Sequence, residues 1–329
     1  MTKIPANQPL LEVKNLRVEF PTRRGTLVAV HDVSLHIDPG EVLGVVGESG
    51  AGKSMTGAAV IGLLEPPGRI ADGEIRLEGE RIDDLPYEQM RRIRGRRIGA
   101  IFQDPLTSLN PLYRVSKQLI ETIQTHLPMT EKQARARALD LLKEVGIPAA
   151  EERLDHYPHQ FSGGMRQRVV IALALCAEPR LIIADEPTTA LDVSIQAQII
   201  SLLKRLCREH HTAVMLVTHD MGVIAEAADR VAVMYAGRIV EVGPVREVVR
   251  NAKHPYTVGL MGSIPHVGAD VDRLVQIEGS MPRLTDHPTG CAFHPRCPRV
   301  MDRCREQRPE LRNVDGVDTA CHLFEEVPA

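Results

Sequence analysis

The residues Gly47-Glu-Ser-Gly-Ala-Gly-Lys53-Ser54 match the pattern G-x-x-x-x-G-K-[ST]. An apolar, strand-like run precedes this stretch and a helical pattern follows it. Glycines let consecutive backbone N–H groups curl around phosphate oxygens at a helix N-terminus, where the helix dipole favours anions. Lys53 can reach the β- and γ-phosphates, and the Ser54 hydroxyl can bind Mg²⁺. The residues predicted to contact the nucleotide are Gly47, Glu48, Ser49, Gly50, Ala51, Gly52, Lys53, Ser54 and Met55.

Two further stretches place polar side chains at the ends of apolar runs. In "RLIIADEP" (180–187), Asp185 stands at the carboxyl end of a short buried strand, where ligands bind in open α/β sheets. Asp185 is predicted as the carboxylate on the magnesium side, and Glu186 as the general base for an attacking water. In "TAVMLVTHD" (212–220), His219 follows another strand and could polarise the γ-phosphate or the water. These stretches and the phosphate loop together predict hydrolysis of a nucleoside triphosphate.

A second glycine-containing helix start lies in "HQFSGGMRQRVVIALALCAEP" (159–179). Ser162 is a plausible N-cap, and Gly163 and Gly164 open a mostly apolar helix. Exposed amides at a helix N-terminus form a second phosphate-binding surface. One chain does not need two such surfaces for one γ-phosphate, unless the second serves a nucleotide held by a partner subunit.

The ordered set of motifs resembles the ATP-binding subunit of ABC transporters. To the stretches above it adds "IFQDP" with Gln103 and "TALD" with Asp192, and the match spans roughly residues 10–245. The resemblance implies a head-to-tail dimer with two ATP molecules sandwiched between subunits. Asp192 would cross the dimer interface, and Gln103 would touch Mg²⁺ and the water and link hydrolysis to a membrane subunit. Phe20, in "LRVEF", looks like the aromatic residue that stacks on adenine.

The stretch "FSGGM" corresponds to the family's signature motif. The resemblance implies that Ser162, Gly163 and Gly164 hold the γ-phosphate of the ATP bound to the partner's phosphate loop. The commonest signature ends in Gln, whereas Met165 stands there in this chain, and a thioether cannot donate the hydrogen bonds of an amide. A working site is still expected, because the serine and both glycines are present. The version "FSGGMRQR" also resembles one subfamily, the importers of oligopeptides and dipeptides.

The predicted fold class is α/β, a P-loop NTPase core of the ABC type with an antiparallel β subdomain and a helical subdomain. Residues 10–37 alternate as strands do, and about 104–175 read as helical. Within the helical part, Thr130 and Gln133 form a predicted capping box. One face of that helix is predicted to be apolar through Ala138, Leu141, Leu142 and Val145. The nucleotide-binding domain is placed at 1–250, followed by an irregular extension at 251–329.

Four of the six cysteines lie in the extension, at Cys291, Cys297, Cys304 and Cys321. Their spacing fits neither the C-x2-C pairs usual for structural zinc nor the bacterial ferredoxin run. The residues alone leave zinc, an iron–sulfur cluster or unliganded thiols open. The extension looks like that of the peptide-importer ATPases, some of which hold a [4Fe–4S] cluster there, so the resemblance favours a cluster, with zinc as the alternative. Cys176 and Cys207 lie in helical runs and are predicted to be packed thiols.

Composition limits the cellular setting. The 329 residues are 43% hydrophobic and 25% charged, with a formal net charge of −3, so no basic surplus points to nucleic acid as a partner. No apolar stretch reaches the roughly 20 residues that a membrane helix needs. The N-terminus lacks the basic start and apolar core of a signal peptide. The protein is therefore expected at the cytoplasmic face of the cell membrane, held there by partners.

The predicted function is ATP hydrolysis that powers import of di- or oligopeptides. The resemblance implies two transmembrane permease subunits, a second ATPase subunit that is identical or homologous, and a separate extracytoplasmic solute-binding protein. One alternative is an importer of nickel, glutathione or another small solute. An alternative from another class is a soluble ABC ATPase of translation or DNA repair, but the chain lacks their coiled-coil insertions and tandem domains. A regulatory protein that binds ATP without hydrolysing it is a third reading.

Overall fold

The computed structural model describes residues 8–189, 191–263 and 276–325, with the side chains of residues 105 and 106 excepted. The chain divides into two compact units, each assembled from separate stretches of sequence. The first unit comprises residues 1–10, 37–41 and 84–216, and the second comprises residues 11–36, 42–83 and 217–329. Parts of the predicted extension, residues 264–275 and 326–329, lie outside the described residues.

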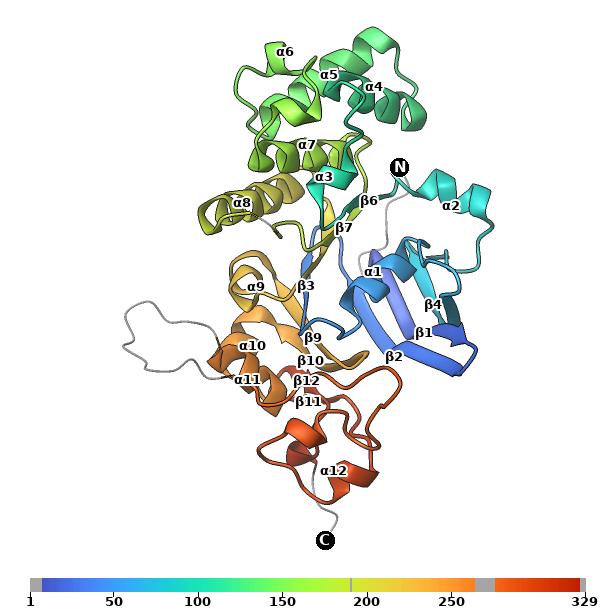
Figure 1. The fold of residues 1–329 in the computed structure, drawn as a ribbon, viewed down its shortest axis with the longest axis vertical. Coiled ribbons are helices and arrows are strands. Elements are labelled where there is room, and N and C mark those ends of the chain that lie inside the picture. The colour runs from blue at the N-terminus through green and yellow to red at the C-terminus, as the bar shows by residue number, and fades with distance from the viewer. Residues whose placement is uncertain (1–7, 190, 264–275, 326–329) are drawn as a thin grey trace. The chain divides into compact units, whose positions relative to one another are not determined.

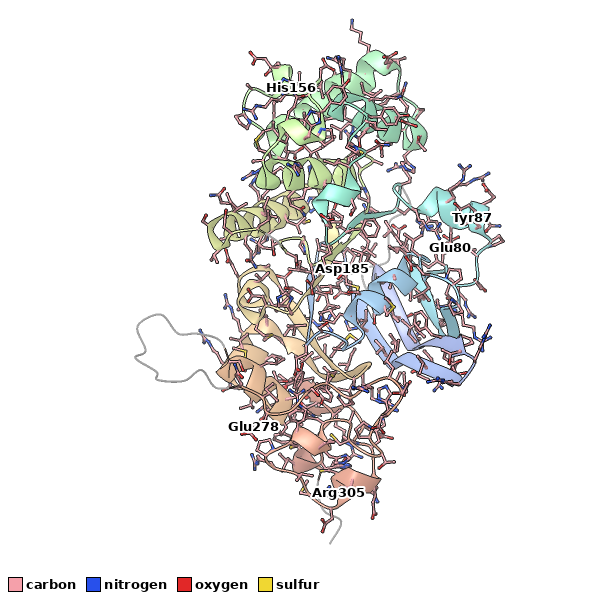
Figure 2. The ribbon with its side chains drawn as sticks, in the orientation of Figure 1. Glu80, Tyr87, His156, Asp185, Glu278 and Arg305 are labelled. Carbon is pink, nitrogen blue, oxygen red and sulfur yellow. The ribbon has the colours of Figure 1, made fainter. Side chains whose placement is uncertain are left out.

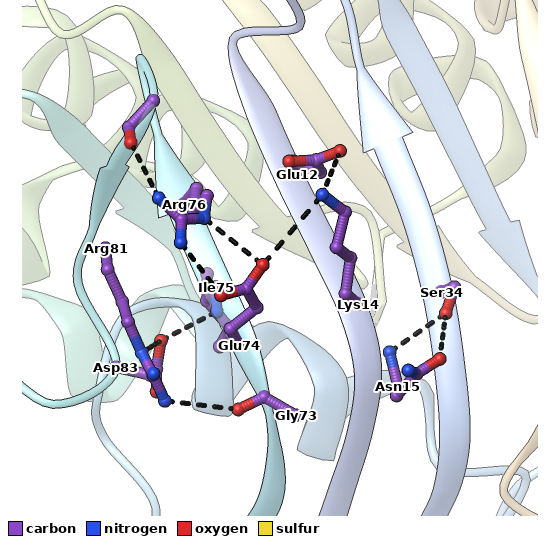
Figure 3. A network of polar contacts seen from close by, with 11 residues as sticks. Glu12, Lys14, Asn15, Ser34, Gly73, Glu74, Ile75, Arg76, Arg81 and Asp83 are labelled. Atoms are coloured by element: carbon purple, nitrogen blue, oxygen red, sulfur yellow. Dashed lines mark hydrogen bonds and ion pairs between the residues drawn. The ribbon is translucent and has the colours of Figure 1, made fainter.

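The second unit contains a four-stranded sheet in the order β2-β1-β4-β5. Its strands are β1 (Leu11–Thr22), β2 (Gly25–Ile37), β4 (Arg69–Leu77) and β5 (Glu80–Arg81). In β1, Leu11 and Val13 are buried, and the outward positions between them carry charge. Lys14 Nζ lies 2.9 Å from Glu12 and 3.9 Å from Glu74 on antiparallel β4, as Figure 3 shows. Inward apolar and outward charged residues on alternate positions are typical of a sheet with one buried face, and the predicted antiparallel sheet is confirmed.

The second unit also contributes the strand order β11-β12-β10-β9-β3. These strands are β3 (Val42–Val46), β9 (Arg230–Tyr235), β10 (Arg238–Pro244), β11 (Arg312–Val314) and β12 (Val317–Thr319). β3 and β9 are parallel, and β10 pairs antiparallel with β9 and with β12. All five residues of β3 are buried, as expected for a strand covered on both faces. The helices of this unit are α1 (Lys53–Val60), α9 (Met221–Ala227), α10 (Val245–Arg250), α11 (Pro255–Gly262) and α12 (Arg303–Glu306).

The first unit contains strands β8, β7 and β6 in that order. They are β6 (Ile98–Ile101), β7 (Leu181–Asp185) and β8 (Ala213–Thr218), whose last two residues belong to the second unit. β6 and β7 run parallel. In β7, the residues before Asp185 are buried, so the strand ends where its first polar side chain appears.

Helices make up most of the first unit, and several of them pack together in one part of it (Figure 1). They are α2 (Tyr87–Ile93), α3 (Pro105–Ser108), α4 (Val115–His126), α5 (Glu131–Glu144), α6 (Ala150–Arg153), α7 (Gly163–Leu175) and α8 (Val193–Glu209). α8 is the longest helix among the described residues, with 17 residues. No helix in the described part of the chain is both long and apolar enough to cross a membrane.

The start of α5 confirms the predicted capping box. The Thr130 hydroxyl accepts a hydrogen bond from the Gln133 N–H at 3.4 Å, and the Gln133 side chain accepts from the Thr130 N–H at 2.9 Å. These two bonds satisfy amides that the first helical turn otherwise leaves without partners. The predicted apolar face is buried as well: Ala138, Leu141, Leu142 and Val145 are at most 4% exposed. The predicted helix and its buried apolar face are therefore present.

Candidate functional site

The phosphate loop connects β3 to α1 in the second unit, and its backbone explains its glycines. Gly47 has φ +157°, and a Cβ on it would lie 2.2 Å from the Met234 carbonyl oxygen. Gly52 has φ +98°, in the left-handed region that L side chains rarely adopt, and forms the N-cap of α1. Any larger residue at either position would force the loop away from its neighbours. The two glycines therefore allow the loop backbone to pack closely against β9 and the chain at Ala29.

Lys53 begins α1 and is only 6% exposed. Its ammonium donates hydrogen bonds to the carbonyl oxygens of Gly47, at 2.8 Å, and of Glu48, at 3.1 Å. The charge thus lies over the loop, within the concavity where phosphate oxygens are expected. Ser54 follows on the first helical turn and is half-buried. The buried Thr56 hydroxyl donates to the Gly52 carbonyl at 3.0 Å, which anchors the start of the helix.

Glu48 is held by groups that the motif did not predict. Its backbone N–H donates to the hydroxyl of Tyr256, on α11, at 2.9 Å. Its carboxylate oxygens lie 3.0 and 3.1 Å from Nη1 of Arg296. The only sequence signal for these contacts was the resemblance of the segments that carry them, "HPYT" and "FHPRCP", to the peptide-importer extension. Both the loop and its two partners belong to the second unit.

The acid pair lies in the first unit, where Asp185 ends β7 (Figure 2). Glu186 follows in the left-handed region, with φ +46°. Its carboxylate accepts a hydrogen bond from the Gln103 amide at 3.1 Å and another from the Thr189 hydroxyl at 2.8 Å. Gln103 and Glu186 are 83 residues apart in sequence, and the structure brings these two predicted site residues together. Thr189 was not predicted, although it stands within the "TALD" motif.

His219 and Phe20 lie in the second unit, as do the phosphate-loop residues. His219 directly follows β8 and is exposed, and the next residue, Asp220, caps α9 by accepting from the N–H groups of Gly222 and Val223. This turn fixes the strand end that carries the histidine. Phe20 is half-buried on β1, and its ring lies 2.7 Å from the point where a Cβ on Gly68 would be. The roles of both side chains stay predictions.

The signature segment forms the N-terminus of α7 in the first unit. Ser162 is the N-cap, and its hydroxyl oxygen accepts from the Met165 N–H at 3.3 Å. Ser162 and Gly163 are exposed, so their amides face solvent. Arg153 Nη1 lies 3.2 Å from the Met165 sulfur. Asp192 is an exposed N-cap residue of α8.

The four cysteines of the extension all lie in the second unit. Burial raises the pKa of the Cys291 thiol to about 11, and the charges of Cys304, Cys321 and Cys297 raise it further. In the described part of the chain, however, no group of three or more His, Cys, Asp or Glu side chains is arranged to hold a metal ion. The geometry by itself therefore gives no support to the predicted iron–sulfur or zinc site.

The remaining thiols and a neighbouring histidine behave as structural groups. Cys176 and Cys207 are at most 1% exposed, and burial raises the pKa of each to about 12, which confirms them as packed thiols. His322 follows Cys321, but its Nδ1 lies 2.8 Å from a Glu325 oxygen and its Nε2 lies 2.8 Å from the Gln307 carbonyl oxygen. Both ring nitrogens are engaged, so His322 is not a free ligand.

Comparison with known proteins agrees with this geometry at two levels. Residues 30–189 match the model of the ABC transporter family, and residues 240–304 match the oligopeptide/dipeptide transporter C-terminal region. The dimeric structure of a post-hydrolysis state of the ATP-binding cassette MJ0796, bound to ADP and Pi, is similar with a TM-score of 0.64 and 31% identity. It covers 72% of this chain and 99% of its own. The fold is therefore that of an ABC ATPase cassette.

Relatives extend the match along nearly the whole chain. The oligopeptide transport ATP-binding protein AppD of Bacillus subtilis is 46% identical over 319 residues, which cover 96% of this chain and 97% of AppD. The dipeptide transport ATP-binding protein DppD of Escherichia coli is 45% identical over 314 residues, covering 95% of this chain and 96% of DppD. The chain belongs to the family of ABC transporter ATP-binding proteins.

Proposed function

We propose that this protein is the ATP-hydrolysing subunit of an importer of di- or oligopeptides. The observation that carries the proposal is the coincidence, in one chain, of the ABC transporter match over 30–189 and the oligopeptide/dipeptide match over 240–304. The relatives named for oligopeptide and dipeptide transport support the same reading, since they align over almost their full lengths. We assign the nucleotide-binding domain to residues 1–250, with the helical subdomain at about 104–175, and the extension to 251–329.

Hydrolysis follows from the chemistry of the assigned side chains. Lys53 and the loop amides bind the β- and γ-phosphates. Ser54 and Asp185 would hold Mg²⁺, which would offset the negative charge of the phosphates. Glu186 accepts a proton from the attacking water, and the Gln103 amide, already 3.1 Å from that carboxylate, orients both groups. His219 stabilises the charge that develops on the γ-phosphate. Phe20 stacks on the adenine ring.

A second copy, or a homologous subunit, completes each ATP site. Ser162, Gly163 and Gly164 present a solvent-facing helix N-terminus that fits the γ-phosphate of a nucleotide held by another subunit. Asp192 contributes to the interface between the two subunits. The similarity to a dimeric ABC cassette bound to ADP and Pi supports this arrangement. Met165 replaces the usual Gln without removing any of the three phosphate-binding residues.

The energy of hydrolysis is passed to membrane partners. We assign two transmembrane permease subunits and, indirectly, an extracytoplasmic solute-binding protein that captures the peptide. The protein then works as a peripheral subunit at the cytoplasmic face of the membrane. Gln103 is suited to report the state of the ATP site to a permease, since its exposed side chain contacts Glu186 directly.

The proposal is tested with Glu186→Gln in the assembled transporter in proteoliposomes. Loss of the base lowers ATP hydrolysis by roughly 100-fold or more, while binding of a fluorescent ATP analogue is retained. Glu152→Gln, at an exposed glutamate of the same unit, is the matched control and keeps full turnover. Unchanged hydrolysis in Glu186→Gln would contradict the assignment of the base. Peptide uptake that persists in a deletion strain, with loss of nickel or glutathione uptake instead, would overturn the peptide assignment.

We further propose that Cys291, Cys297, Cys304 and Cys321 hold a [4Fe–4S] cluster, with zinc as the alternative. The support is chemical: four thiols are the donor set that iron–sulfur clusters and zinc share, and their charges interact. Such a group would crosslink an extension that has little regular structure. The group has no assigned step in ATP hydrolysis.

Anaerobic purification followed by iron, sulfide and zinc analysis tests this second proposal. About four irons and four sulfides per chain with a broad visible absorption are expected for the cluster. One zinc per chain in a colourless protein would show that the cysteines bind zinc and not an iron–sulfur cluster. Neither metal, in a chain that still binds ATP, would contradict both.

A further inference from the structure

The phosphate loop and the cysteine-bearing extension meet at Glu48. Every polar part of this residue is engaged: its carbonyl oxygen with Lys53, its N–H with Tyr256 and its carboxylate with Arg296. Only the first of these contacts comes from the loop itself. The other two come from residues more than 200 positions away along the chain, within the same unit.

Arg296 is built into its position by several independent contacts. It ends a short 3₁₀ helix (His294–Arg296), and its side chain is 6% exposed. Its Nε donates to the Glu278 carbonyl at 2.9 Å, and its Nη2 donates to the Ile277 carbonyl at 3.3 Å. The guanidinium also lies over the Tyr235 ring, 5.8 Å from its centroid. A guanidinium fixed in this way has lost its rotamer freedom before it meets the carboxylate.

Tyr256 is equally well fixed. Its ring is fully buried and packs against Tyr235 and Phe293, with centroid distances of 4.7 and 5.4 Å. Its own N–H donates to Nδ1 of the buried His254 at 3.1 Å. The hydroxyl that accepts the Glu48 N–H is therefore carried by a rigid aromatic cluster.

We propose that Arg296 and Tyr256 are positioning residues of the ATP site, which act by holding Glu48 and neutralising its charge beside the bound triphosphate. The Glu48 side chain is 30% exposed and its partner is nearly buried, so this ion pair is screened less than a surface pair. Without Arg296, a free carboxylate would stand next to the phosphates and repel them. The inference rests on the proposed binding of ATP by the loop and assigns the extension a direct role in it.

The test measures binding of mant-ATP by the purified full-length chain. Arg296→Gln is expected to weaken binding by roughly tenfold, the effect of losing one charge-assisted contact. In the double variant Arg296→Gln/Glu48→Gln, removal of the uncompensated carboxylate restores affinity to within about threefold of wild type. A role confined to folding would give no such rescue. In the assembled transporter, Arg296→Gln raises the KM for ATP and leaves kcat at saturating ATP near its wild-type value.

Arg305→Gln is the matched control. Arg305 (Figure 2) is an exposed arginine of the same extension that, like Arg296, is adjacent to a cysteine. Its replacement is expected to leave mant-ATP affinity unchanged. Tyr256→Phe provides a second test that does not depend on the folding of Arg296→Gln. It keeps the buried ring but loses the acceptor for the Glu48 N–H, and it is expected to weaken mant-ATP binding by about threefold.

Three outcomes would decide against the inference. Wild-type affinity in a folded Arg296→Gln variant, wild-type affinity in Tyr256→Phe, or a double variant as weak as the single one would each overturn it while the proposed function stands. Failure of the wild-type chain to bind mant-ATP would instead overturn the proposed function.

Discussion

Two helix N-termini of this protein are assigned to phosphate, and they are capped in different ways. At α1, the N-cap is Gly52 in the left-handed region, which has no side chain to accept from the first helical amides. At α7, the N-cap is Ser162, and its hydroxyl oxygen already accepts from the Met165 N–H. The first N-terminus therefore has no side-chain cap, whereas the second is capped by its own serine.

The surroundings of the two N-termini differ in the same sense. Lys53, at α1, is 6% exposed and is held by the loop carbonyls, so a cation is present before any nucleotide binds. At α7, Ser162 and Gly163 are exposed, and the first turn contains no acidic residue that would repel a phosphate. The difference suggests a division of labour. In the function proposed above, the α1 site would bind nucleotide within one chain, and the α7 site would engage only when another subunit presents its γ-phosphate.

The largest expected effect comes from removing the cation at α1. Lys53→Gln leaves the triphosphate without its fixed positive charge, so hydrolysis by the assembled transporter falls roughly 1000-fold. Binding of mant-ATP to the isolated chain weakens by about 30-fold or more, since a charge-assisted contact is lost. Lys204, on α8, offers a control outside the phosphate loop: Lys204→Gln leaves binding unchanged. Retained affinity in Lys53→Gln would mean that the amides alone bind the nucleotide.

A smaller effect is expected at α7, and it separates binding from hydrolysis. Ser162→Ala lowers hydrolysis by about 10- to 100-fold, because one donor to the γ-phosphate is lost, but leaves mant-ATP affinity of the isolated chain unchanged. The same substitution costs about 1 kcal/mol of stability through the lost cap. Ser162→Asn keeps the cap and serves as the control for stability, while Ser162→Thr keeps the hydroxyl as well and restores turnover. A loss of mant-ATP affinity in Ser162→Ala would contradict the division between the two N-termini.

Sequence alone predicted the features whose interactions are local. The phosphate loop, the Thr130–Gln133 capping box and the buried face of α5 each depend on residues within about one or two helical turns. Short patterns determine such features because the backbone brings the residues together whatever the rest of the chain does. The strands of residues 10–37 likewise followed from local alternation, whereas the pairing of β1 with β4 joins distant residues.

The features that sequence did not predict depend on contacts far along the chain. The Glu48–Arg296 ion pair joins residues 248 positions apart, and nothing in either motif indicates the other. The buried carboxylate of Glu241 likewise accepts from the N–H groups of Lys253 and His254, a contact that no spacing rule predicts. The contact between Gln103 and Glu186 was not predicted, although both residues were expected near the attacking water. The spacing of the four cysteines did not decide between zinc, an iron–sulfur cluster and unliganded thiols, because it matches no pattern that is specific to one of them.

Acid is expected to destabilise the unit that carries α1, and the buried His254 is one of the histidines responsible. Burial lowers the pKa of His254 to about 3, so the folded state keeps it neutral while the unfolded chain binds a proton below pH 6.5. Stability therefore falls as pH decreases from about 6.5 towards 3, by up to about 1.4 kcal/mol per pH unit. His254→Asn keeps an acceptor for the Tyr256 N–H and reduces this slope, measured by urea unfolding followed by tyrosine fluorescence. An unchanged slope would show that His254 is protonated without cost in the folded state.

The smallest expected effect belongs to the α7 unit, where Asp155 is bound by Arg135. Hydrogen bonds from Arg135 and then from Ser116 lower the pKa of Asp155 to about 2. The stability that this carboxylate contributes is complete above pH 3.8 and is lost as pH falls towards 2. Its side chain is 37% exposed, so the contribution is less than about 1 kcal/mol after solvent screening. Asp155→Asn should therefore lower the unfolding free energy at pH 5 by less than about 1 kcal/mol. The dependence of the unfolding free energy on pH between 6.5 and 4 should stay unchanged. If Asp155→Asn changed the pH dependence of the unfolding free energy as much as His254→Asn does, the two units would not differ in their response to acid.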